Sequence, residues 1–201
     1  MGLTVACVLR SGGRYDAEDV ARLRDGVAAH LRTDHDFVCL SDVDVPCERI
    51  PLVHGWPGWW SKMEMFLLPP PVLYFDLDTI VVGDLGDIAE QAEKWQFTML
   101  RDFYREKGLG SGLMAWGLPM ETLHDKFAED PEGWIDKCGG QGDQNFIERH
   151  VNQDHVAHWQ DELPGQVVSY KVHVAGRGVP RGARAVCFHG KPKPRDIGWT
   201  L

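Results

Sequence analysis

The chain has 201 residues, of which 43% are hydrophobic and 25% are charged, as in an ordinary globular protein. This length favours a single domain with a sizeable hydrophobic core. The formal net charge is −9, which argues against a nucleic-acid-binding protein, and no apolar run of about 18 residues predicts a transmembrane segment.

The N-terminal part of the chain has the pattern of a strand–helix–strand unit. An apolar run over Leu3–Leu9 predicts a first strand, and the loop 10–15 follows it. Asp16 and Asp19 then form an N-cap arrangement that predicts a helix. The apolar stripe of this helix consists of Val20, Leu23, Val27 and Leu31. A second apolar run, Phe37–Leu40, predicts the next strand, so this region is typical of an open parallel sheet.

A short helix and a buried strand are expected next along the chain. Ser61 and Glu64 fit a capping box, which predicts a short helix that runs to Leu68. Three prolines at positions 69–71 would end this helix. The run Val72–Phe75 is apolar at every position, which is typical of a strand that a parallel sheet buries on both faces.

The second half of the chain predicts further strands and helices, without internal repeats or a low-complexity linker. The expected elements are strands at Gln96–Leu100, Leu113–Trp116 and Ala185–Phe188, a helix that begins near Pro119, and a helix after the glycine-rich turn 139–142. The tail from Gly190 is expected to lie as a loop across the body of the protein. We therefore predict an α/β protein in which residues 1–201 form one domain.

The cysteines and the N-terminus both favour a cytoplasmic protein. The five cysteines are an odd number and include no C-x-x-C pair, so we expect free thiols in a reducing compartment. The sequence begins MGLTVACVLRSGG, without the charged segment and the cleavage site of a signal peptide. We expect this segment to be the first strand instead.

Two acids, Asp76 and Asp78, follow directly after the buried strand 72–75. Alternate residues of a strand point to the same side, so the two carboxylates are expected to lie together. Two like charges beside a core are costly unless a positive group lies between them; a divalent metal, a lysine or a shared proton would serve. Open α/β sheets bind ligands at the carboxyl ends of such strands, which favours a functional role over a solvated turn.

The C-terminal segment is basic and carries a histidine. Between Glu162 and Asp196 there is no acid, but there are seven basic residues. They are Lys171, Arg177, Arg181, Arg184, Lys191, Lys193 and Arg195. A basic segment beside a pair of carboxylates suits a metal-bound diphosphate. His189 follows the last expected strand, and two carboxylates with one imidazole can hold Mn²⁺.

Taken in order, these motifs resemble those of nucleotide-sugar glycosyltransferases with the GT-A fold, and most closely those of glycosyltransferase family eight. The corresponding segments are FDLDTI, SGLMAW, GDQN and FHGKPKP, which together span most of the chain. The resemblance implies a mostly parallel central sheet flanked by helices. It also implies a metal-dependent, retaining transfer of a sugar from a nucleotide-diphosphate sugar, preferably a UDP-sugar, to an acceptor that the sequence does not identify. Mn²⁺ or Mg²⁺ is the implied cofactor.

The resemblance further implies roles for individual residues. Asp76, Asp78 and His189 match the metal ligands of the family. Asp143 and Gln144 match the pair near the transferred sugar, so they are the candidate catalytic residues, in a double displacement or in a front-face attack. The candidate donor-binding residues are Arg10, Ser11, Tyr15, Lys62, Leu77, Ser111, Gly112, Gly190, Lys191 and Lys193. Among these, Tyr15 is a candidate to stack on the nucleobase, and Lys193 matches the lysine that contacts the diphosphate.

Several features depart from the family pattern. The C-terminal motif His-Gly-Lys-Pro-Lys-Pro-Arg is two residues shorter and lacks the final tryptophan, so Lys191 is a candidate to share or take the role of Lys193. Gly110 stands where the family has an asparagine, which removes a side chain that the family uses for sugar recognition. The chain is also short for the family, which suggests that acceptor-binding elaborations are trimmed.

Two other functions compete with sugar transfer. The segment FDLDTIV also matches the first motif of haloacid-dehalogenase-like phosphatases, in which Asp76 would be the nucleophile and Asp78 the acid–base. That motif normally ends the first strand of its domain, whereas about seventy residues precede it here. A non-catalytic sugar-nucleotide-binding protein is the other alternative, because fold alone does not decide function. The tryptophans Trp56, Trp59 and Trp60 are candidates for core packing or for stacking on an acceptor sugar.

Overall fold

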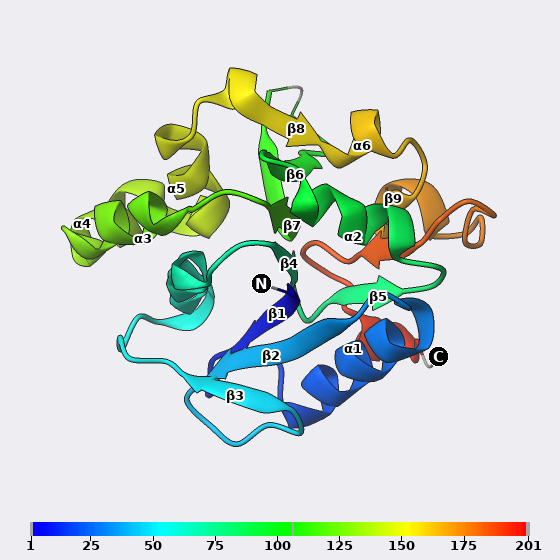
Figure 1. Cartoon of the computed structure of the whole chain (residues 1–201), viewed down its shortest axis with the longest axis horizontal. Helices are drawn as coiled ribbons and strands as arrows, with labels where there is room; N and C mark the ends of the chain where they lie inside the picture. The colour runs from blue at the N-terminus through cyan, green and yellow to red at the C-terminus, as the bar shows by residue number, and fades with distance from the viewer. Residues whose placement is uncertain (1, 106, 200–201) are drawn as a thin grey trace.

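Two β-sheets organise the chain, whose computed structural model describes residues 2–105 and 107–199 (Figure 1). The strands are β1 (Leu3–Leu9), β2 (His35–Ser41), β3 (Glu48–Pro51), β4 (Val72–Phe75), β5 (Thr79–Val81), β6 (Phe97–Arg101), β7 (Leu109–Trp116), β8 (Val156–His158), β9 (Val167–Ser169) and β10 (Ala185–Cys187). The α-helices are α1 (Ala17–His30), α2 (Gly86–Glu93), α3 (Glu121–Ala128), α4 (Pro131–Cys138), α5 (Gly142–His150) and α6 (Trp159–Glu162). The 3₁₀ helices are η1 (Gly58–Leu67), η2 (Gly139–Gln141), η3 (Gln153–His155) and η5 (Pro194–Ile197), and η4 (Tyr170–Val174) is a π-helix.

The larger sheet has seven strands in the order β3-β2-β1-β4-β7-β6-β8. Within the described residues, its neighbouring strands are parallel except where β7 pairs with β4 and with β6. Strand β7 therefore runs against the others, and the prediction of a mostly parallel sheet flanked by helices is confirmed. Strand β4 lies at the centre and all four of its residues are buried, which explains why its sequence is a continuous apolar run.

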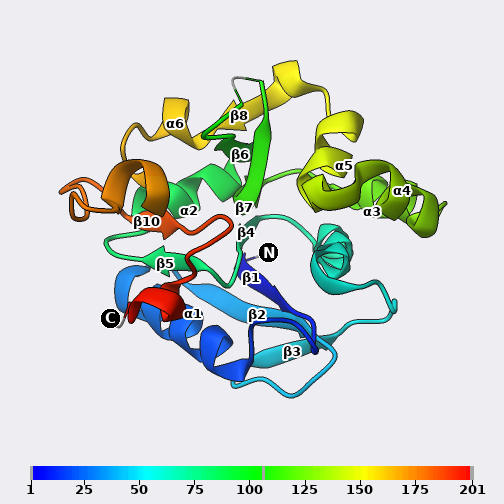
Figure 2. The same cartoon turned by 180° about the vertical axis from the view of Figure 1, so that it is seen from behind.

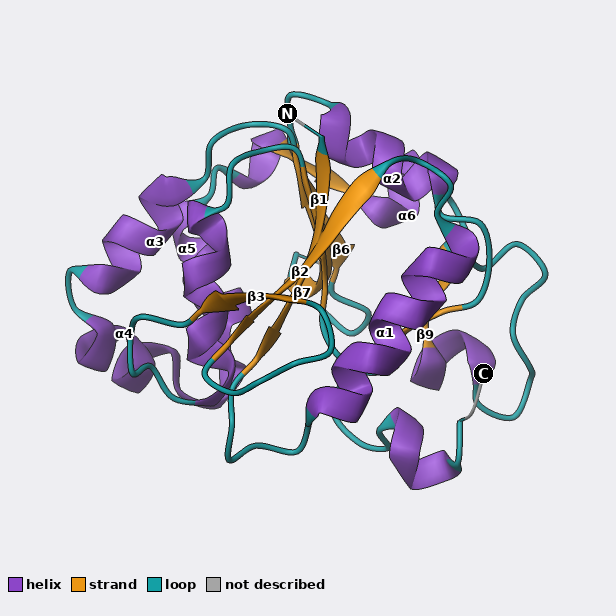
Figure 3. Ribbon diagram, turned by 60° about the horizontal axis from the view of Figure 1, so that its bottom comes forward, coloured by secondary structure: helices purple, strands orange, loops and turns teal. Residues whose placement is uncertain are grey.

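Helices cover both faces of the larger sheet (Figure 3). Helices α1, α2 and α6 pack on one face, where Val20 joins a core that includes Phe75. Helices η1, α3 and α5 pack on the other face, where Phe66 and Phe146 join a core that includes Tyr74. Tyr74 and Phe75 are neighbours on β4, so the alternation of side chains along a strand divides the core into two layers.

The smaller sheet brings the C-terminal tail to the end of β4. Its order is β5-β10-β9, and β5 begins directly after the turn that contains the two acids. Strand β10 pairs antiparallel with β5, so that Cys187 lies opposite Thr79. The backbone N–H of Phe188 then donates to the carbonyl of Asp78 at 3.1 Å. This pairing explains how Lys193 reaches Asp78 although 115 positions separate the two residues.

The first predicted helix is confirmed together with its cap. The Asp16 side chain accepts from the backbone N–H groups of the first turn, and the Asp19 side chain accepts from the Asp16 N–H at 3.1 Å. The predicted capping box at Ser61 and Glu64 is wrong. Helix η1 is a 3₁₀ helix that begins at Gly58, and both residues lie inside it. Glu64 instead accepts from the N–H groups of residues 53 and 54, so it holds the loop that precedes the helix.

The cysteines behave as the sequence predicts. The free thiols are Cys7, Cys39, Cys47, Cys138 and Cys187, and all except Cys47 are buried. Burial raises the pKa of the Cys187 thiol to about 12, so it packs as a small neutral side chain. In the part of the chain that the structure describes, no helix is both long and apolar enough to cross a membrane.

Candidate functional site

The candidate site lies at the carboxyl end of β4, where the chain turns out of the larger sheet toward β5. The backbone N–H of Asp76 donates to the Gly112 carbonyl at 2.9 Å, which extends the β4–β7 pairing by one residue. The N–H of Thr79 closes the turn on the Asp76 carbonyl at 2.9 Å. Because β7 is antiparallel to β4, this register places Ser111 and Gly112 beside the acids.

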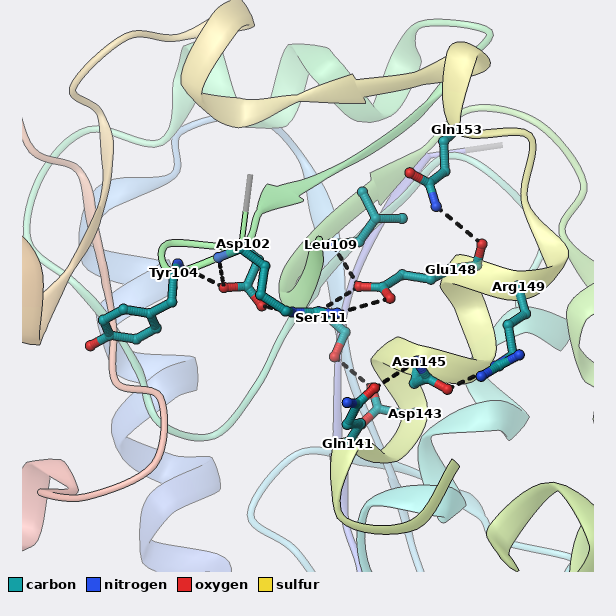
Figure 4. Close-up of polar contacts among 11 residues, drawn as sticks. Asp102, Tyr104, Leu109, Ser111, Gln141, Asp143, Asn145, Glu148, Arg149 and Gln153 are labelled. Atoms are coloured by element: carbon teal, nitrogen blue, oxygen red, sulfur yellow. Dashed lines mark hydrogen bonds and ion pairs between the residues drawn. The ribbon is translucent and has the colours of Figure 1, made fainter. Parts of the chain in front are cut away.

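Asp76 contacts a buried cluster of polar side chains. The ammonium of Lys62 lies 2.8 Å from Asp76 Oδ1 and 3.0 Å from Asp143 Oδ2. Lys62 also donates to Ser111 Oγ at 3.2 Å. Ser111 Oγ donates to Asp143 Oδ2 at 2.5 Å (Figure 4). The Tyr74 hydroxyl donates to Asp76 Oδ1 at 2.7 Å. The structure therefore brings together four predicted site residues: Lys62 of η1, Ser111 of β7, Asp143 of α5 and Asp76 at the end of β4. We call these four residues and Tyr74 the buried cluster.

One cation balances two carboxylates in the buried cluster. Only 5% of Lys62 is exposed, and burial alone would lower its pKa. The charges of Asp143 and Asp76 outweigh burial and raise the pKa of Lys62. Burial raises the pKa of Tyr74, and the charge of Asp76 raises it further. Lys62 is therefore a fixed ammonium at neutral pH, and Tyr74 is a neutral hydrogen-bond donor.

Asp78 contacts a different set of groups. The Tyr15 hydroxyl donates to Asp78 Oδ2 at 2.9 Å, and the ammonium of Lys193 forms an ion pair with the same oxygen. The Lys193 ammonium also lies 5.7 Å from the centre of the Tyr15 ring. Burial raises the pKa of Asp78 and the charge of Asp76 adds to this, whereas Lys193 lowers it. The anionic form of Asp78 therefore depends on Lys193.

Ion pairs hold the C-terminal tail against the N-terminal part of the chain, and all of their groups are exposed except the buried Asp19. Arg195 Nη2 lies 2.6 Å from Asp16 Oδ1 and 3.0 Å from Asp19 Oδ2. Arg14 Nη2 lies 3.2 Å from Asp196 Oδ1. We call these three contacts the clasp. They fix η5 beside α1, as Figure 2 shows for the end of the chain.

The loop after β1 is tied to an acid that the sequence reasoning did not assign to the site. Arg10 Nη1 lies 3.0 Å from Asp42 Oδ2, and the Ser11 N–H donates to Asp42 Oδ1 at 2.8 Å. Burial would raise the pKa of Asp42, but the hydrogen bonds from Ser11 and the charge of Arg10 lower it overall. Asp42 directly follows β2, which pairs parallel with β1. An acid immediately after a strand is the signal that could have found it.

His189 is not turned toward the acids. Its Nε2 lies 2.5 Å from Ser169 Oγ on β9, and its ring stacks on Phe103 with the centroids 5.5 Å apart. Burial lowers the pKa of His189, and the nearby charges of Lys171 and Lys193 lower it further. The imidazole is therefore neutral at neutral pH and is bound to a hydroxyl.

The predicted metal site is not assembled in this arrangement. Within residues 2–105 and 107–199, no three His, Cys, Asp or Glu side chains lie close enough together to hold a metal ion. Carboxylates suit a hard dication chemically. Here, however, Asp76 already pairs with Lys62 and Asp78 with Lys193, and a dication between them would be repelled by both ammonium groups. As placed, Asp76, Asp78 and His189 do not fit the predicted ion, and Mn²⁺ or Mg²⁺ stays a prediction.

The remaining predicted residues occupy the surroundings of this turn. Leu77 packs in the core, and its carbonyl accepts from an arginine of α1 at 2.7 Å. Gln144 is half-buried and directly follows Asp143 on α5. Gly190 has φ +69°, and a Cβ built there would lie 3.0 Å from Lys171 Nζ, so this turn requires glycine. Lys191 is exposed on the tail.

A second polar network, which the sequence did not predict, ties the loop between β6 and β7 to α5 (Figure 4). Arg105 Nη2 lies 2.6 Å from Glu148 Oε1, and Arg105 Nε lies 2.9 Å from Asp102 Oδ2. Glu148 Oε1 also accepts from the Leu109 N–H at 2.7 Å. This network fixes the start of β7 against α5, the two elements that supply Ser111 and Asp143 to the buried cluster.

Comparison with known proteins reveals similarity at the level of structure only. No protein-family model and no curated protein matches the chain. The crystal structure of the glycosyltransferase GlyE of Streptococcus pneumoniae TIGR4 is similar with a TM-score of 0.71 and 15% identity, over 98% of this chain and 60% of that one. An active-site mutant of LgtC gives 0.62 and 13%, over 95% of this chain and 89% of that one. The galactosyltransferase LgtC in complex with donor and acceptor sugar analogs gives 0.58 and 15%, over 95% and 88%.

These similarities establish the fold. The chain spans about 60% of the GlyE structure, and its α/β architecture is that of GT-A glycosyltransferases resembling family eight. The order of the strands does not support the phosphatase alternative, because that motif normally ends the first strand of its domain and the acids here follow the fourth strand in the chain. At identities of 13–15% the likeness carries no residue roles, so the activity is a matter for proposal.

Proposed function

We propose that the chain transfers a sugar from a nucleotide-diphosphate sugar to a hydroxyl acceptor. The observation that carries this proposal is the buried cluster, in which Lys62 joins Asp76 to Asp143 at the carboxyl end of β4. Ligands of open α/β sheets bind at this end of the strands. A buried ammonium shared by two acids is also a costly arrangement, and such arrangements concentrate at functional sites.

The donor diphosphate would bind between the acids and the C-terminal tail. Lys193 and Lys191 come from this tail, and Lys171 lies next to it beside Gly190. Their ammonium groups would offset the charge that develops on a leaving diphosphate. The loop 10–15 and Asp42 lie at the ends of β1 and β2, where a carboxylate suits ribose hydroxyls. The uridine nucleotide follows from the family resemblance.

Asp143 and Gln144 are the proposed catalytic residues. The carboxylate of Asp143 is held by Lys62 and Ser111, so its orientation is set before a substrate arrives. A carboxylate fixed in this way can attack the anomeric carbon or stabilise positive charge on it during front-face attack. Both retaining routes remain open, with Gln144 as the neighbouring polar group in each.

Calorimetric titration with UDP tests the donor site. We expect UDP to bind, and we expect Asp76→Ala to weaken binding strongly because it disrupts the buried cluster. Running the titration with Mn²⁺ and with EDTA measures the predicted metal dependence separately. Absence of binding for UDP, GDP and CDP in both conditions would remove the proposal. Hydrolysis or transfer that releases UDP from a UDP-sugar would distinguish a transferase from a non-catalytic sugar-nucleotide-binding protein.

A further inference from the structure

Trp59 is a large apolar side chain that remains in solvent next to the candidate site. It is 54% exposed, whereas its neighbours Trp56 and Trp60 are 8% and 3% exposed. Those two tryptophans pack on Phe127, with ring centroids 4.8 and 5.1 Å apart. Leaving an indole in water forgoes the burial of a large apolar surface. Core packing therefore accounts for two of the three tryptophans and not for Trp59.

The position of Trp59 is set by the helix that carries Lys62. Side chains three residues apart eclipse one another on a 3₁₀ helix, and η1 is such a helix. Trp59 therefore stands one turn from Lys62 on the same face. Lys62 is buried and reaches Asp76 and Asp143, while Trp59 is exposed. The indole thus lies where the buried cluster meets solvent.

A contact with α5 holds the indole from a second side. Gly142 begins α5 and directly precedes Asp143. Its φ is +63°, and a Cβ built there would lie 2.7 Å from Trp59 Nε1, so this position requires glycine for its backbone and for its space. Trp59 therefore packs against the residue that introduces the catalytic candidate. The two helices η1 and α5 fix one ring edge and leave the rest of the side chain exposed.

We propose that Trp59 is the acceptor platform and that the acceptor is a carbohydrate whose pyranose ring lies on the exposed indole. This inference rests on the proposed sugar transfer and names its acceptor class. A pyranose presents C–H groups on its face and hydroxyls at its rim, so it can cover an aromatic face while its hydroxyls keep their hydrogen bonds. The C–H groups carry partial positive charge, which matches the negative face of the indole. A hydroxyl of the stacked ring then points to the start of α5, where Asp143 and Gln144 lie.

The chain contains a matched control for this proposal. Trp95 is 77% exposed and lies in the segment between α2 and β6. Strand β6 runs in the same direction as β4, so Trp95, two residues before it, lies at the opposite end of the sheet from Asp76. A general effect of exposed indoles would appear at both tryptophans, and an acceptor would affect Trp59 alone.

Indole ¹⁵N NMR measures binding at each tryptophan. Trp59→Phe and Trp95→Phe assign the two signals, and the wild-type protein is titrated with methyl β-galactoside, methyl β-glucoside and lactose, with and without UDP. We expect at least one saccharide to shift the Trp59 signal and none to shift the Trp95 signal. If none of the three shifts Trp59 at concentrations that would saturate a millimolar complex, the platform is refuted. Failure of UDP to bind would instead refute the proposed function, since the titration without UDP still reports on the platform.

Kinetics separate an acceptor contact from a structural role. With the saccharide that shifts Trp59 as acceptor, Trp59→Ala should raise the acceptor KM by about tenfold or more while UDP affinity stays within about twofold. Trp59→Tyr should recover part of the loss, since it keeps an aromatic face, and Trp95→Ala should behave as the wild type. An unchanged acceptor KM in Trp59→Ala, or an equal loss of UDP affinity, would overturn the proposal.

Discussion

The two acids of the candidate site are two positions apart in sequence, yet they are held by different parts of the molecule. Asp76 is held from the interior, by Lys62 and Tyr74 within the buried cluster. Asp78 is held from the periphery, by Tyr15 of the loop after β1 and by Lys193 of the C-terminal tail. The tail itself is kept in place by the ion pairs of the clasp.

The groups around Asp76, which we call the Asp76 half, and those around Asp78, the Asp78 half, differ in the free energy needed to rearrange them. The side chain of Lys62 is 6% exposed, whereas those of Arg195 and Asp16 are 43% and 54% exposed. Removing one partner of a buried ion pair costs about 3–5 kcal/mol. An exposed ion pair contributes only about 0–1 kcal/mol. We therefore expect the Lys62 contacts of the Asp76 half to be a fixed scaffold, and the clasp that holds the tail beside Asp78 to open and close around a ligand at little cost.

Replacing Lys62 is the strongest way to test the fixed half. Lys62→Met should lower the free energy of unfolding by about 3–5 kcal/mol, because it leaves the buried Asp143 and the half-buried Asp76 without their shared cation. Urea denaturation measures this loss. Lys126→Met is the matched control, since Lys126 pairs with Glu129 at 3.1 Å on the surface and should change stability by less than about 1 kcal/mol. Similar losses in the two variants would contradict the comparison.

Replacing Lys193 tests whether the peripheral half supplies charge to the ligand. Lys193→Met should weaken UDP binding by about tenfold to a hundredfold, the range expected for one charged hydrogen bond. Stability should fall less than in Lys62→Met, because the pKa of Asp78 rises further without Lys193 and the acid can take up a proton instead of staying charged. Lys191→Met, on the same tail, should have a smaller effect since Lys191 is exposed. If UDP binding instead needs Mn²⁺ and tolerates Lys193→Met, the predicted metal and not the lysine offsets the diphosphate charge.

Removing the clasp should affect binding more than stability. Arg195→Ala breaks the contacts to Asp16 and Asp19, but the buried Asp19 keeps its ion pair with Arg22 at 2.6 Å. We expect UDP affinity to fall by about threefold and the free energy of unfolding to fall by less than about 1 kcal/mol. Raising the salt concentration should reduce the difference between the variant and the wild type, because it screens the same ion pairs. A stability loss as large as that of Lys62→Met would show that the tail is part of the scaffold.

The parts of the fold that the sequence predicts are those with a complete local pattern. The apolar run Val72–Phe75 is β4, and the Asp16–Asp19 capping box starts α1 as expected. The acids after β4 were identified for the same reason, because an uninterrupted apolar strand followed by two carboxylates is a local signal. Strand β7 was found only in its second half, since Gly110 and Gly112 weaken the strand pattern at its start.

The rest depends on pairings that no local pattern contains. Strands β5 and β9 have three residues each and are stable only because β10 joins them. Since β9 was not predicted, the sequence could not show that Ser169 would bind His189 and turn it from the acids. The clasp joins Arg195 to Asp16 across 179 positions, and a charge pattern does not specify such partners. The position of Asp42 directly after β2 is a local signal, but its contacts with Arg10 and Ser11 are likewise non-local.

The smallest predicted effect compares the two acids directly. The pKa of Asp78 is raised in the folded state, chiefly by burial, so folding favours its protonated form. The resulting cost of its negative charge is absent below the ordinary carboxyl pKa of about 3.9, grows as the pH rises from there to the raised folded pKa, and is constant above it. Asp78→Asn cannot ionise, so it should be more stable than the wild type at pH 7 by about 1 kcal/mol, or about 2–4 °C in Tm. This gain should vanish as the pH falls below about 4.

Replacing Asp76 by asparagine should change the stability in the opposite direction. Asp76→Asn removes a carboxylate from the buried Lys62 and should lower stability at pH 7, whereas Asp78→Asn frees a lysine that can reach water. Both variants should weaken UDP binding. Weaker binding together with higher stability in Asp78→Asn would mean that the Asp78 carboxylate serves the ligand and lowers the stability of the fold. Thermal denaturation of both variants between pH 3 and pH 8 measures the signs. A destabilised Asp78→Asn at pH 7 would mean that the Lys193 ion pair outweighs burial, and that the peripheral half is as fixed as the interior one.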